Sequence, residues 1–541
     1  MNRAEVPAED FAETQDPDVA GAEDVVTAEV VTEKDEGAEG TEKDSIATEE
    51  GTEKDSIAVA YVSQLLSQLP PRIKKWWIPN VKSLLDDACD DEGILPVGSA
   101  CSCSEVWLIG IKAFMTVWNR SHYEDTTTRA THSECCCEID EPRQKFIIEQ
   151  HGPQVLVGDV ELLSQSRVLN LVTHKPAILP WMALFGSGFS CTSITKQSSI
   201  RASNKGCVRK KEGSTGSTFE GVRKVIVKHR PKVSFLENVE ELASTYDVDG
   251  LETSDLDYVK DAFAENSMTL LDVHMDARMH GSYNQLHRLW MIVYDLPRET
   301  VLRLHVEEKF HDILNCLGME PYRPEGFFLT RHEISELLAD HLNCDDLFKK
   351  QREDPKWQSV HEEFFSERGF TWPPPSDLDL PRSFITRQRE VIWASNKLFP
   401  AEAPGKWQWF DANHSIERVL HIDEAQLKNP WSDHVPTFTG QSCMVGRLLD
   451  EIDGLTFKHL HPVEGFRMKG WDKKDWVVPI GGSSADIEKK TLTNILGNMW
   501  SLFHFCPLLV AALGCVNWNE CGGAPATPES NGSHSSGSGT S

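Results

Sequence analysis

Long apolar runs are missing from this 541-residue chain. No stretch approaches the ~18 to 20 consecutive apolar residues that a membrane-spanning helix needs. The N-terminus has neither the apolar core of a signal peptide nor the arginine-rich character of a transit peptide. The 14 cysteines lack the regular spacing of a disulfide framework, which favours reduced thiols. We therefore expect an intracellular protein without a membrane partner.

Aromatic residues are almost absent from residues 1–58, where nineteen acidic and four basic side chains give a net charge of −15. Such a segment cannot bury enough apolar area to offset the entropy of ordering. Its octamer at residues 40–47 recurs at 51–58, but two copies of a polar octamer make no solenoid. The Ser/Gly-rich residues 521–541 have no core-forming pattern either. We expect disordered tails at both ends.

Basic side chains are scarce overall, since the chain carries a net charge of −30, yet they concentrate in one segment. Residues 196–232 hold eleven Lys or Arg against two acids, a local charge of +9. We predict that this Gly/Ser-rich segment is a loop that grips a polyanion, and the alternative is a solvated loop without a partner. The candidate contacts are Lys196, Arg201, Lys205, Arg209, Lys210 and Lys211.

Two apolar runs flank the basic segment, and each has the length and borders of a buried strand. Residues 178–185 lead into a turn that contains Cys191, and residues 233–236 lead into Glu237. In open α/β sheets, ligands bind at the carboxyl ends of strands. We therefore expect the Cys191 thiol and the Glu237 carboxylate to face one crevice, as a nucleophile and an acid.

Three shorter strands are predicted earlier, at residues 94–97, 134–137 and 155–157, after helical periodicity over residues 59–91. A turn of small residues and an amphipathic helix follow the first strand, which is how a Rossmann-like half places a nucleotide near a helix N-terminus. Glu138 follows the second strand and Asp159 the third. Each acid alone could also be a helix N-cap. The order predicts an α/β sheet with helices on both faces.

Several segments resemble, in the same order, the motifs of the cytosine-5 DNA methyltransferase family. Residues 188–192 resemble its Gly-Phe-Pro-Cys-Gln, and residues 237–239 reproduce its Glu-Asn-Val. Residues 280–290 resemble Tyr-Gly-x-Pro-Gln-x-Arg-x-Arg-x-Tyr, and residues 460–471 resemble Leu-Thr-Pro-x-Glu-x-x-Arg-Leu-Gln-Gly-Phe. Leu496-Gly497-Asn498 resembles the closing Ile-Gly-Asn. The likeness covers about residues 93–515, apart from a long insert.

The resemblance implies a class I methyltransferase that uses S-adenosylmethionine on duplex DNA, and a nuclear location. Cys191 would add to carbon 6 of a flipped cytosine, Glu237 would protonate its nitrogen 3, and Arg288 would hold the base. The residues implied at the cofactor are Cys101, Ser104, Glu138, Ile139, Asp159, Val160 and Asn498.

The same likeness divides the chain into a catalytic domain at residues 59–296 and 441–520, with an α-rich target-recognition insert at 297–440. The departures from the family pattern are Cys101, Cys103, Glu105 and Val106 in the cofactor turn, Ser190 in place of a proline, and Asn284 and Leu286 in place of a glutamine and an arginine. Two alternatives stay open: a catalytically silent relative that binds nucleic acid, and an RNA cytosine-5 methyltransferase. Cysteines 101–137 contain no C-x-x-C pair, so buried thiols are expected rather than a metal site.

Overall fold

The computed structural model describes residues 55–122, 129–195, 204–248, 250–329, 355–372, 386–401, 403–412, 429–440, 442–450, 454–477 and 489–521. All of them belong to one compact unit, Asp55–Ser541. The disordered tails fall mainly on residues 1–54 and 522–541, and the contacts at Lys196 and Arg201 fall in residues 196–203, so these predictions lie outside the described residues. Helix α1 (Ile57–Gln68) begins at Ile57, just inside the first predicted tail.

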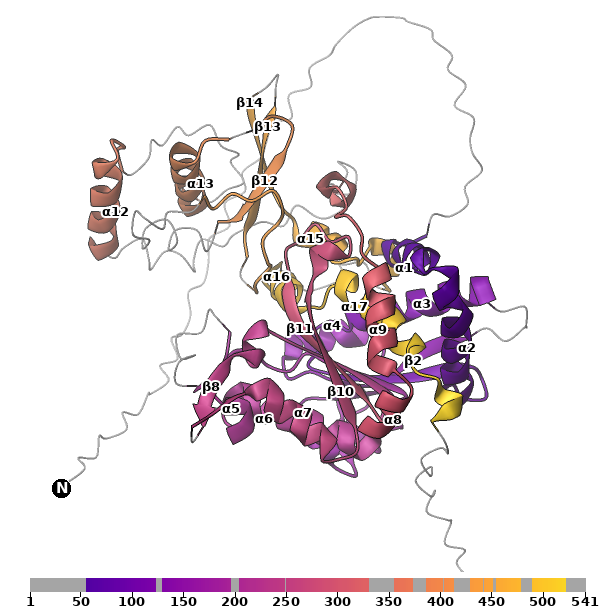
Figure 1. Cartoon of the computed structure of the whole chain (residues 1–541). Helices are drawn as coiled ribbons and strands as arrows, with labels where there is room; N and C mark the ends of the chain where they lie inside the picture. Colours follow the sequence, from indigo (N-terminus) through magenta and orange to yellow (C-terminus); the bar gives the residue numbers. More distant parts are fainter. Residues whose placement is uncertain are drawn as a thin grey trace, which may run out of the picture. The chain divides into compact units, whose positions relative to one another are not determined.

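Seven strands form the central sheet in the order β10-β11-β7-β6-β1-β2-β3 (Figure 1). Their bounds are β1 Ile94–Ala100, β2 Ala130–Cys137, β3 Val155–Val157, β6 Leu184–Ser187, β7 Val233–Asn238, β10 Thr269–Asp276 and β11 His287–Tyr294. Strands β3, β2, β1, β6 and β7, in this spatial order, pair in parallel. Strand β11 is antiparallel to both β7 and β10. The predicted Rossmann-like α/β fold is therefore confirmed.

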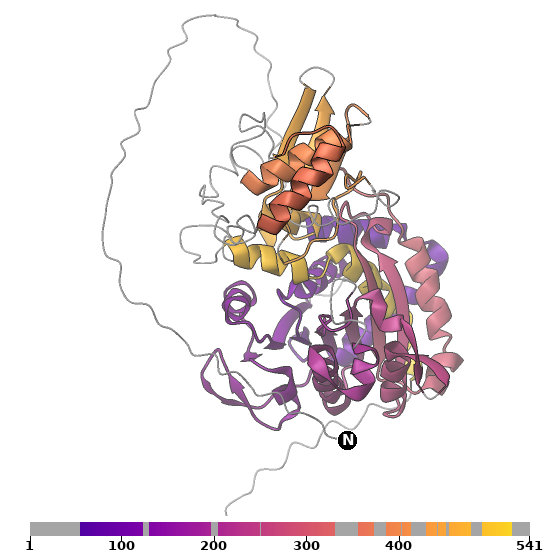
Figure 2. The same cartoon turned by 90° about the vertical axis from the view of Figure 1, so that its left-hand side faces the viewer.

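Helices cover both faces of this sheet, as Figures 1 and 2 show. One face shares a hydrophobic core with α1, α2 (Pro71–Ala88), α3 (Val106–His122), α9 (Val306–Cys316) and α17 (Leu502–Gly514). The other face packs against η1 (Val160–Ser164), α5 (Cys207–Lys210), α6 (Gly213–His229) and α7 (Asp255–Ala264). Helix α4 (Glu141–His151) contributes Ile147 to a small cluster with Cys136 and Leu156.

Strand β11 is apolar without interruption from Leu289 to Tyr294, and its position in the sheet explains why. Trp290, Ile292 and Tyr294 lie in the core on one face of the sheet, while Leu289, Met291 and Val293 lie in the core on the other. Successive side chains of a strand point to opposite faces, so a strand covered on both sides must be apolar at every position. β11 therefore joins the two cores.

Two predictions about local structure are wrong. The strand expected at residues 178–185 begins only at Leu184, and Ile178 and Trp181 are exposed, at 69% and 42%. The basic segment expected to be a loop is largely helical from residue 207, as α5 and α6. The Gly/Ser-rich residues 213–217 form the first turn of α6. The buried stripe that stabilises this helix consists of Phe219, Val222, Val225 and Ile226.

The expectation that no stretch approaches a membrane span is wrong by length and composition, because the helical segment Thr491–Gly514 is long and apolar enough. However, 89% of its apolar window is buried inside the protein. It consists of α16 (Lys489–Asn498) and α17, which are separated at residues 499–501. Every residue of α17 is buried. This is the environment of a core helix, and it explains why α17 is apolar all round.

A second sheet of three strands, β12 (Trp407–Asp411), β13 (Met444–Asp450) and β14 (Gly454–His459), has a small core with α13 (Thr386–Leu398). Its strands come from both sides of residue 440, where the insert is predicted to end. The remaining elements are β4 Val168–Asn170, β5 Lys175–Ala177, β8 Thr245–Val248, β9 Leu251–Ser254, α8 Arg298–Arg303, α12 Pro355–Glu367, α15 Pro462–Met468, and the 3₁₀ turns η3 Glu240–Ala243, η4 Ala277–Met279, η5 Pro324–Phe327, η7 Lys473–Asp475 and η8 Trp518–Glu520.

Candidate active site

The residues expected at the site follow the carboxyl ends of the parallel strands. Cys101 lies in the turn after β1, Glu138 follows β2, and Asp159 follows β3. The loop at residues 188–195 follows β6, and Glu237 lies near the end of β7. Because these strands are parallel and adjacent, all five segments lie along one edge of the sheet.

Three of these segments converge at Gly188. A Cβ atom built on Gly188 would lie 2.9 Å from Trp500 Nε1, 3.2 Å from Glu237 Oε2 and 3.3 Å from the main-chain oxygen of Cys101. Only glycine leaves room for this approach, since the first distance is shorter than carbon atoms in proteins tolerate. The structure thus brings together the nucleophile's loop, the acid and the cofactor turn. It also adds Trp500, which the sequence analysis missed.

Glu237 and Arg288 form an ion pair, with Arg288 Nε 2.6 Å from Glu237 Oε1. The pair forms because β11 lies antiparallel to β7, with Trp290 opposite Glu237 in the register. Both side chains are mostly buried, so their attraction is screened less than at the surface. The arginine holds one carboxylate oxygen and leaves Oε2 on the side of Gly188.

The Cys191 thiol lies in the same electrostatic environment. Burial raises its pKa, the Glu237 carboxylate raises it further, and the Arg288 guanidinium lowers it. The nucleophile is the thiolate, so the resting protein holds Cys191 mainly as the neutral thiol near neutral pH. A reaction at this thiol therefore depends on the cation at Arg288 and on removal of the proton as substrate binds.

The main chain around Cys191 is anchored to its neighbours. Asn238 Nδ2 donates to the Phe189 carbonyl at 3.0 Å, and Asn238 is fully buried at the end of β7. The Cys191 carbonyl accepts from the N–H groups of Ile194 and Thr195, at 3.0 Å each. The asparagine beside Glu237 is therefore a structural link between the two strand ends.

Lys469 is a second buried group that the sequence analysis missed. Its Nζ donates to the Met499 carbonyl at 2.8 Å, and the residue is 1% exposed. Burial and, to a lesser degree, the nearby Arg288 guanidinium lower the pKa of this lysine to about 7, although the Glu237 carboxylate opposes the shift. The sequence signal that could have identified Lys469 is its place in Met468-Lys469-Gly470, where the family pattern has Leu-Gln-Gly.

The turn after β1 has an unusual backbone. Cys101, Cys103 and Glu105 have φ angles of +56°, +68° and +55°. Left-handed conformations cost L-residues with a Cβ roughly 1 kcal/mol each relative to glycine. The Glu105 carboxylate is buried beneath the turn, where it accepts hydrogen bonds from the Ser99 and Ser102 hydroxyls and from Trp107 Nε1 at 2.8 Å. These bonds hold the strained turn in place.

Glu138 is 4% exposed at the end of β2. Its Oε1 accepts from the Asp140 N–H at 3.0 Å and lies 3.5 Å from Arg143 Nη1. Burial raises the pKa of Glu138 and the Arg143 guanidinium lowers it. Arg143 Nε also donates to Asn494 Oδ1 at 3.1 Å, which ties this strand end to α16.

The other residues expected at the cofactor lie in different environments. Ile139 is 79% exposed beside Glu138, whereas Val160 is buried against Gly221 of α6. Asp159 accepts from the Glu161 N–H and caps η1, the alternative that the sequence left open. Ser104 is fully buried, and its hydroxyl has no hydrogen-bond partner among the described residues. In α16, Asn498 Nδ2 donates to the Asn494 carbonyl at 2.8 Å.

Some basic side chains in the described part of the basic segment contact other residues of the protein. Arg209 Nη2 donates to Thr253 Oγ1 at 3.0 Å, and its guanidinium lies 5.6 Å from the centre of the Tyr258 ring. Lys211 Nζ lies 3.4 Å from Glu220 Oε1. Lys205 and Lys210 are exposed, and Lys210 Nζ donates to the Lys205 carbonyl at 3.3 Å. These two lysines are therefore the more available for a polyanion.

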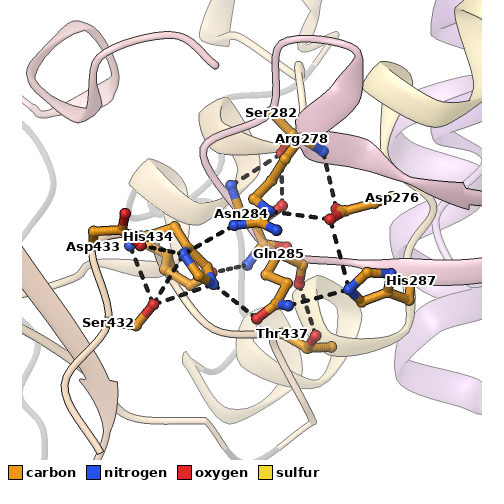
Figure 3. A network of polar contacts seen from close by, with 11 residues as sticks. Asp276, Arg278, Ser282, Asn284, Gln285, His287, Ser432, Asp433, His434 and Thr437 are labelled. Carbon is orange, nitrogen blue, oxygen red and sulfur yellow. Dashed lines mark hydrogen bonds and ion pairs between the residues drawn. The ribbon is translucent and has the colours of Figure 1, made fainter. Parts of the chain in front are cut away.

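Asn284 and Leu286, two departures from the family pattern, have structural uses. Asn284 Nδ2 donates to the carbonyls of Val435 and Pro436, at 3.1 and 2.6 Å, and Leu286 is buried in the core. Beside them, Gln285 Oε1 lies 2.8 Å from His434 Nε2. Figure 3 shows this network, which contains Asp276, Arg278, Ser282, Asn284, Gln285, His287, Ser432, Asp433, His434 and Thr437.

No protein-family model matches this sequence, and no curated protein matches it in sequence. Similar solved structures are methyltransferases. The S. pombe Dnmt2 methyltransferase is 10% identical with a TM-score of 0.40, over 78% of this chain and 98% of that one. The Entamoeba histolytica methyltransferase EhMeth is 10% identical with a TM-score of 0.36, over 77% and 97%. A Spodoptera frugiperda DNMT2 variant is 10% identical with a TM-score of 0.35, over 77% and 99%. At scores this low, the assignment of the fold rests on strand order and direction.

Proposed function

We propose that this protein transfers a methyl group from S-adenosylmethionine to carbon 5 of cytosine in duplex DNA. The observation that carries the proposal is the convergence at Gly188, where the Cys191 loop, the Glu237–Arg288 pair and the turn after β1 meet. This reaction needs a nucleophile, an acid and a bound cofactor close together, and the arrangement at Gly188 fits that need. A nuclear location is part of the same proposal.

The chain's residues at β1 to β3 fit this cofactor. Ser104 has a buried hydroxyl without a partner, and the exposed Ile139 side chain offers an apolar surface beside the Glu138 carboxylate. A carboxylate can accept about four hydrogen bonds, so Glu138 keeps acceptor capacity for the two ribose hydroxyls. Asp159 would reach the adenine amine. When bound, the cofactor supplies an electrophilic methyl group.

The chemistry at the base follows from the two side chains that face it. As the base binds, the Cys191 thiol gives its proton to the Glu237 carboxylate. The thiolate then forms the C–S bond at carbon 6 while nitrogen 3 takes that proton from Glu237, and the resulting enamine offers an electron pair at carbon 5. After carbon 5 is methylated, it loses its proton to a base, and the electron pair left behind expels the Cys191 thiolate. Arg288 stabilises the thiolate and the Glu237 carboxylate in turn.

DNA must deliver the base outside the helix, because a stacked cytosine exposes neither face to Cys191. Extrusion costs a few kcal/mol, which contacts to the backbone must offset. Lys205 and Lys210 are exposed beside α5 and α6, on the segment that follows the Cys191 loop. These lysines, with Lys211, would contribute the phosphate contacts.

A trapped covalent adduct tests the proposal. DNA with 5-fluorocytosine cannot release a proton from carbon 5, so the Cys191 adduct should accumulate and survive denaturing electrophoresis. The adduct should require S-adenosylmethionine and disappear in Cys191→Ser. Glu237→Gln should slow its formation strongly, because the carboxyl proton makes carbon 6 electrophilic.

Long incubations with excess protein, several sequence contexts, hemimethylated duplexes and matched RNA complete the experiment. An adduct that forms on RNA and not on DNA would show that the substrate is RNA. A folded preparation that binds both DNA and cofactor yet forms no adduct would leave a binding protein in place of the enzyme. That second candidate is favoured by one observation, the Glu105 carboxylate that fills the cofactor turn where the family has glycine.

A further inference from the structure

The nucleophile's loop lacks the proline that the family pattern places before the cysteine, and Ser190 stands there instead. Proline has no N–H group and fixes φ, whereas serine keeps an N–H group and leaves the loop freer. The Ser190 N–H donates to Thr218 Oγ1 at 3.1 Å. The bond that takes the place of the proline ring therefore comes from the second turn of α6.

A second threonine of the same helix holds the other side of the loop. The Ser193 N–H donates to Thr215 Oγ1 at 3.2 Å, and Thr215 is fully buried. Cys191 thus lies between two main-chain N–H groups, at positions 190 and 193, that are both bound by threonine hydroxyls. Thr218 Oγ1 itself donates to the Ser214 carbonyl at 2.6 Å, so its lone pairs face the loop.

The hydroxyl clamp, as we call this group, consists of Ser190, Thr192, Ser193, Ser214, Thr215 and Thr218. Two glycines let the helix start close enough to form it. A Cβ on Gly213 would lie 2.9 Å from Ser193 Oγ, and a Cβ on Gly216 would lie 2.4 Å from the Cys207 carbonyl. Gly213 is therefore explained by close contact with the loop, and Gly216 by close contact with the main chain of α5.

We propose that Thr215 and Thr218 are positioning residues for the nucleophile, which fix the main chain on both sides of Cys191 and replace the family's proline. The proposal rests on the proposed function for its reaction readout. Neither threonine touches the base. Each acts through the loop, because a nucleophile displaced by a fraction of an ångström loses the near-attack geometry that covalent catalysis needs.

The first test compares Ser190→Pro with Ser190→Ala. Both variants lose the hydroxyl, and only the proline variant loses the N–H that Thr218 binds. Although it restores the family's residue, Ser190→Pro should slow adduct formation with 5-fluorocytosine DNA roughly tenfold relative to Ser190→Ala, which has lost the same hydroxyl contacts to Thr192 and Ser214 but keeps the N–H group. DNA binding should be equal in all three proteins. A proline variant as fast as the parent, or faster, would overturn the proposal.

The second test compares Thr218→Val with Thr218→Ser. Valine removes the hydroxyl at nearly constant shape and should slow the adduct about as much as Ser190→Pro, whereas serine should restore the rate. Ser217→Ala is the matched control, because Ser217 Oγ donates only to the Ser214 carbonyl and does not reach the loop. If Thr218→Ser is as slow as Thr218→Val, the hydroxyl does not position the loop. If Thr218→Val unfolds, Ser190→Pro tests the same bond.

Alkylation of Cys191 separates this proposal from the proposed function, because it needs neither DNA nor cofactor. Loosening the loop should expose the thiol, so iodoacetamide should modify Cys191 several-fold faster in Thr218→Val and Ser190→Pro. The partly buried Cys101 and Cys89 should keep their rates, as followed by peptide mass spectrometry. An unchanged Cys191 rate in both variants would refute the clamp. A faster rate in a protein that forms no adduct would support the clamp and reject the methyl transfer.

Discussion

The carboxyl edge of the sheet has two halves that hold their functional residues differently. At β6 and β7, Cys191 and Glu237 follow the family's motifs, and hydrogen bonds from Asn238 and from α6 hold the loop. At β1, three residues with side chains take left-handed conformations, and a buried carboxylate holds the turn. Hydrogen bonds to the main chain of the loop therefore hold the first half, whereas a buried carboxylate holds the turn of the second.

This difference shows that residues with side chains can hold a left-handed turn when a buried group supplies the stability that their strain costs. Glu105 accepts three hydrogen bonds, which together offset about the strain of three left-handed residues at roughly 1 kcal/mol each. We therefore expect mutations in the two halves to separate reaction at the base from binding of the cofactor.

The largest effect is expected where the two halves touch. Gly188→Ala places a methyl group 2.9 Å from Trp500 Nε1 and 3.3 Å from the Cys101 carbonyl. The Cys191 loop must then shift by a few tenths of an ångström or more, so adduct formation should fall roughly a hundredfold. Gly326→Ala is the control, because nothing lies within 4 Å of its added Cβ. Equal adduct rates for the two variants would show that the halves do not meet as described.

Replacing Glu138 or Asp159 by alanine should weaken S-adenosylmethionine binding tenfold or more, about 1.4 kcal/mol per tenfold. The ribose hydroxyls and the adenine amine would each lose their acceptor. Isothermal titration calorimetry gives the affinity directly, and Asp159→Asn serves as a control that retains a cap for η1. Both alanine variants should still show normal alkylation of Cys191, which would show that the Cys191 loop is intact. Unchanged cofactor affinity in both variants would show that S-adenosylmethionine does not bind at the ends of β2 and β3.

Lys469 should make stability depend on pH above neutrality. Its folded-state pKa of about 7 lies below the ordinary lysine value of 10.5, so between these two values the unfolded chain binds a proton that the folded protein does not. Stability from this group is therefore present above about pH 10.5 and is lost as pH falls toward 7. Lys469→Met should stabilise the protein more at pH 7 than at pH 10, as measured by urea unfolding. A gain that is the same at both values would mean that Lys469 stays charged when folded.

The smallest effect is expected on DNA binding. Reversing Lys205 and Lys210 to glutamate should reduce the slope of log affinity against log salt by about two, since each phosphate contact contributes about 0.9. Arg209 is a poorer choice, because it binds Thr253 and packs over Tyr258. The affinities of specific and unrelated duplexes should fall together. A slope that does not change would identify this surface as a solvated helix end.

The sequence predicted the fold well where hydrophobic periodicity decides the structure. The third strand, Val155–Val157, has the predicted bounds, and α1 and α2 cover the predicted helical segment. It failed at residues 178–185, since an apolar run says that residues avoid water but not that they pair in a ladder. It also failed at α6, where composition suggested a loop and a buried stripe further along the helix decides the structure.

The site was predictable only in part, for a similar reason. Cys191, Glu237 and Arg288 lie in motifs, and their segments meet as strand order requires. Trp500 and Lys469 reach the site through packing of α15, α16 and α17, which no local pattern reveals. The Glu105 hydrogen bonds likewise depend on a backbone conformation that residue types alone would advise against.

The hydrogen bond from Asn284 to Val435 joins positions 151 residues apart. Closing so long a segment loses chain entropy only as the logarithm of its length, so doubling that length adds only about 0.6 kcal/mol. The segment between these positions could therefore change in length or sequence with little effect on the position of Arg288, which lies four positions after Asn284. The network in Figure 3 fixes the two ends of that segment, so that inserts of very different length would be tolerated there.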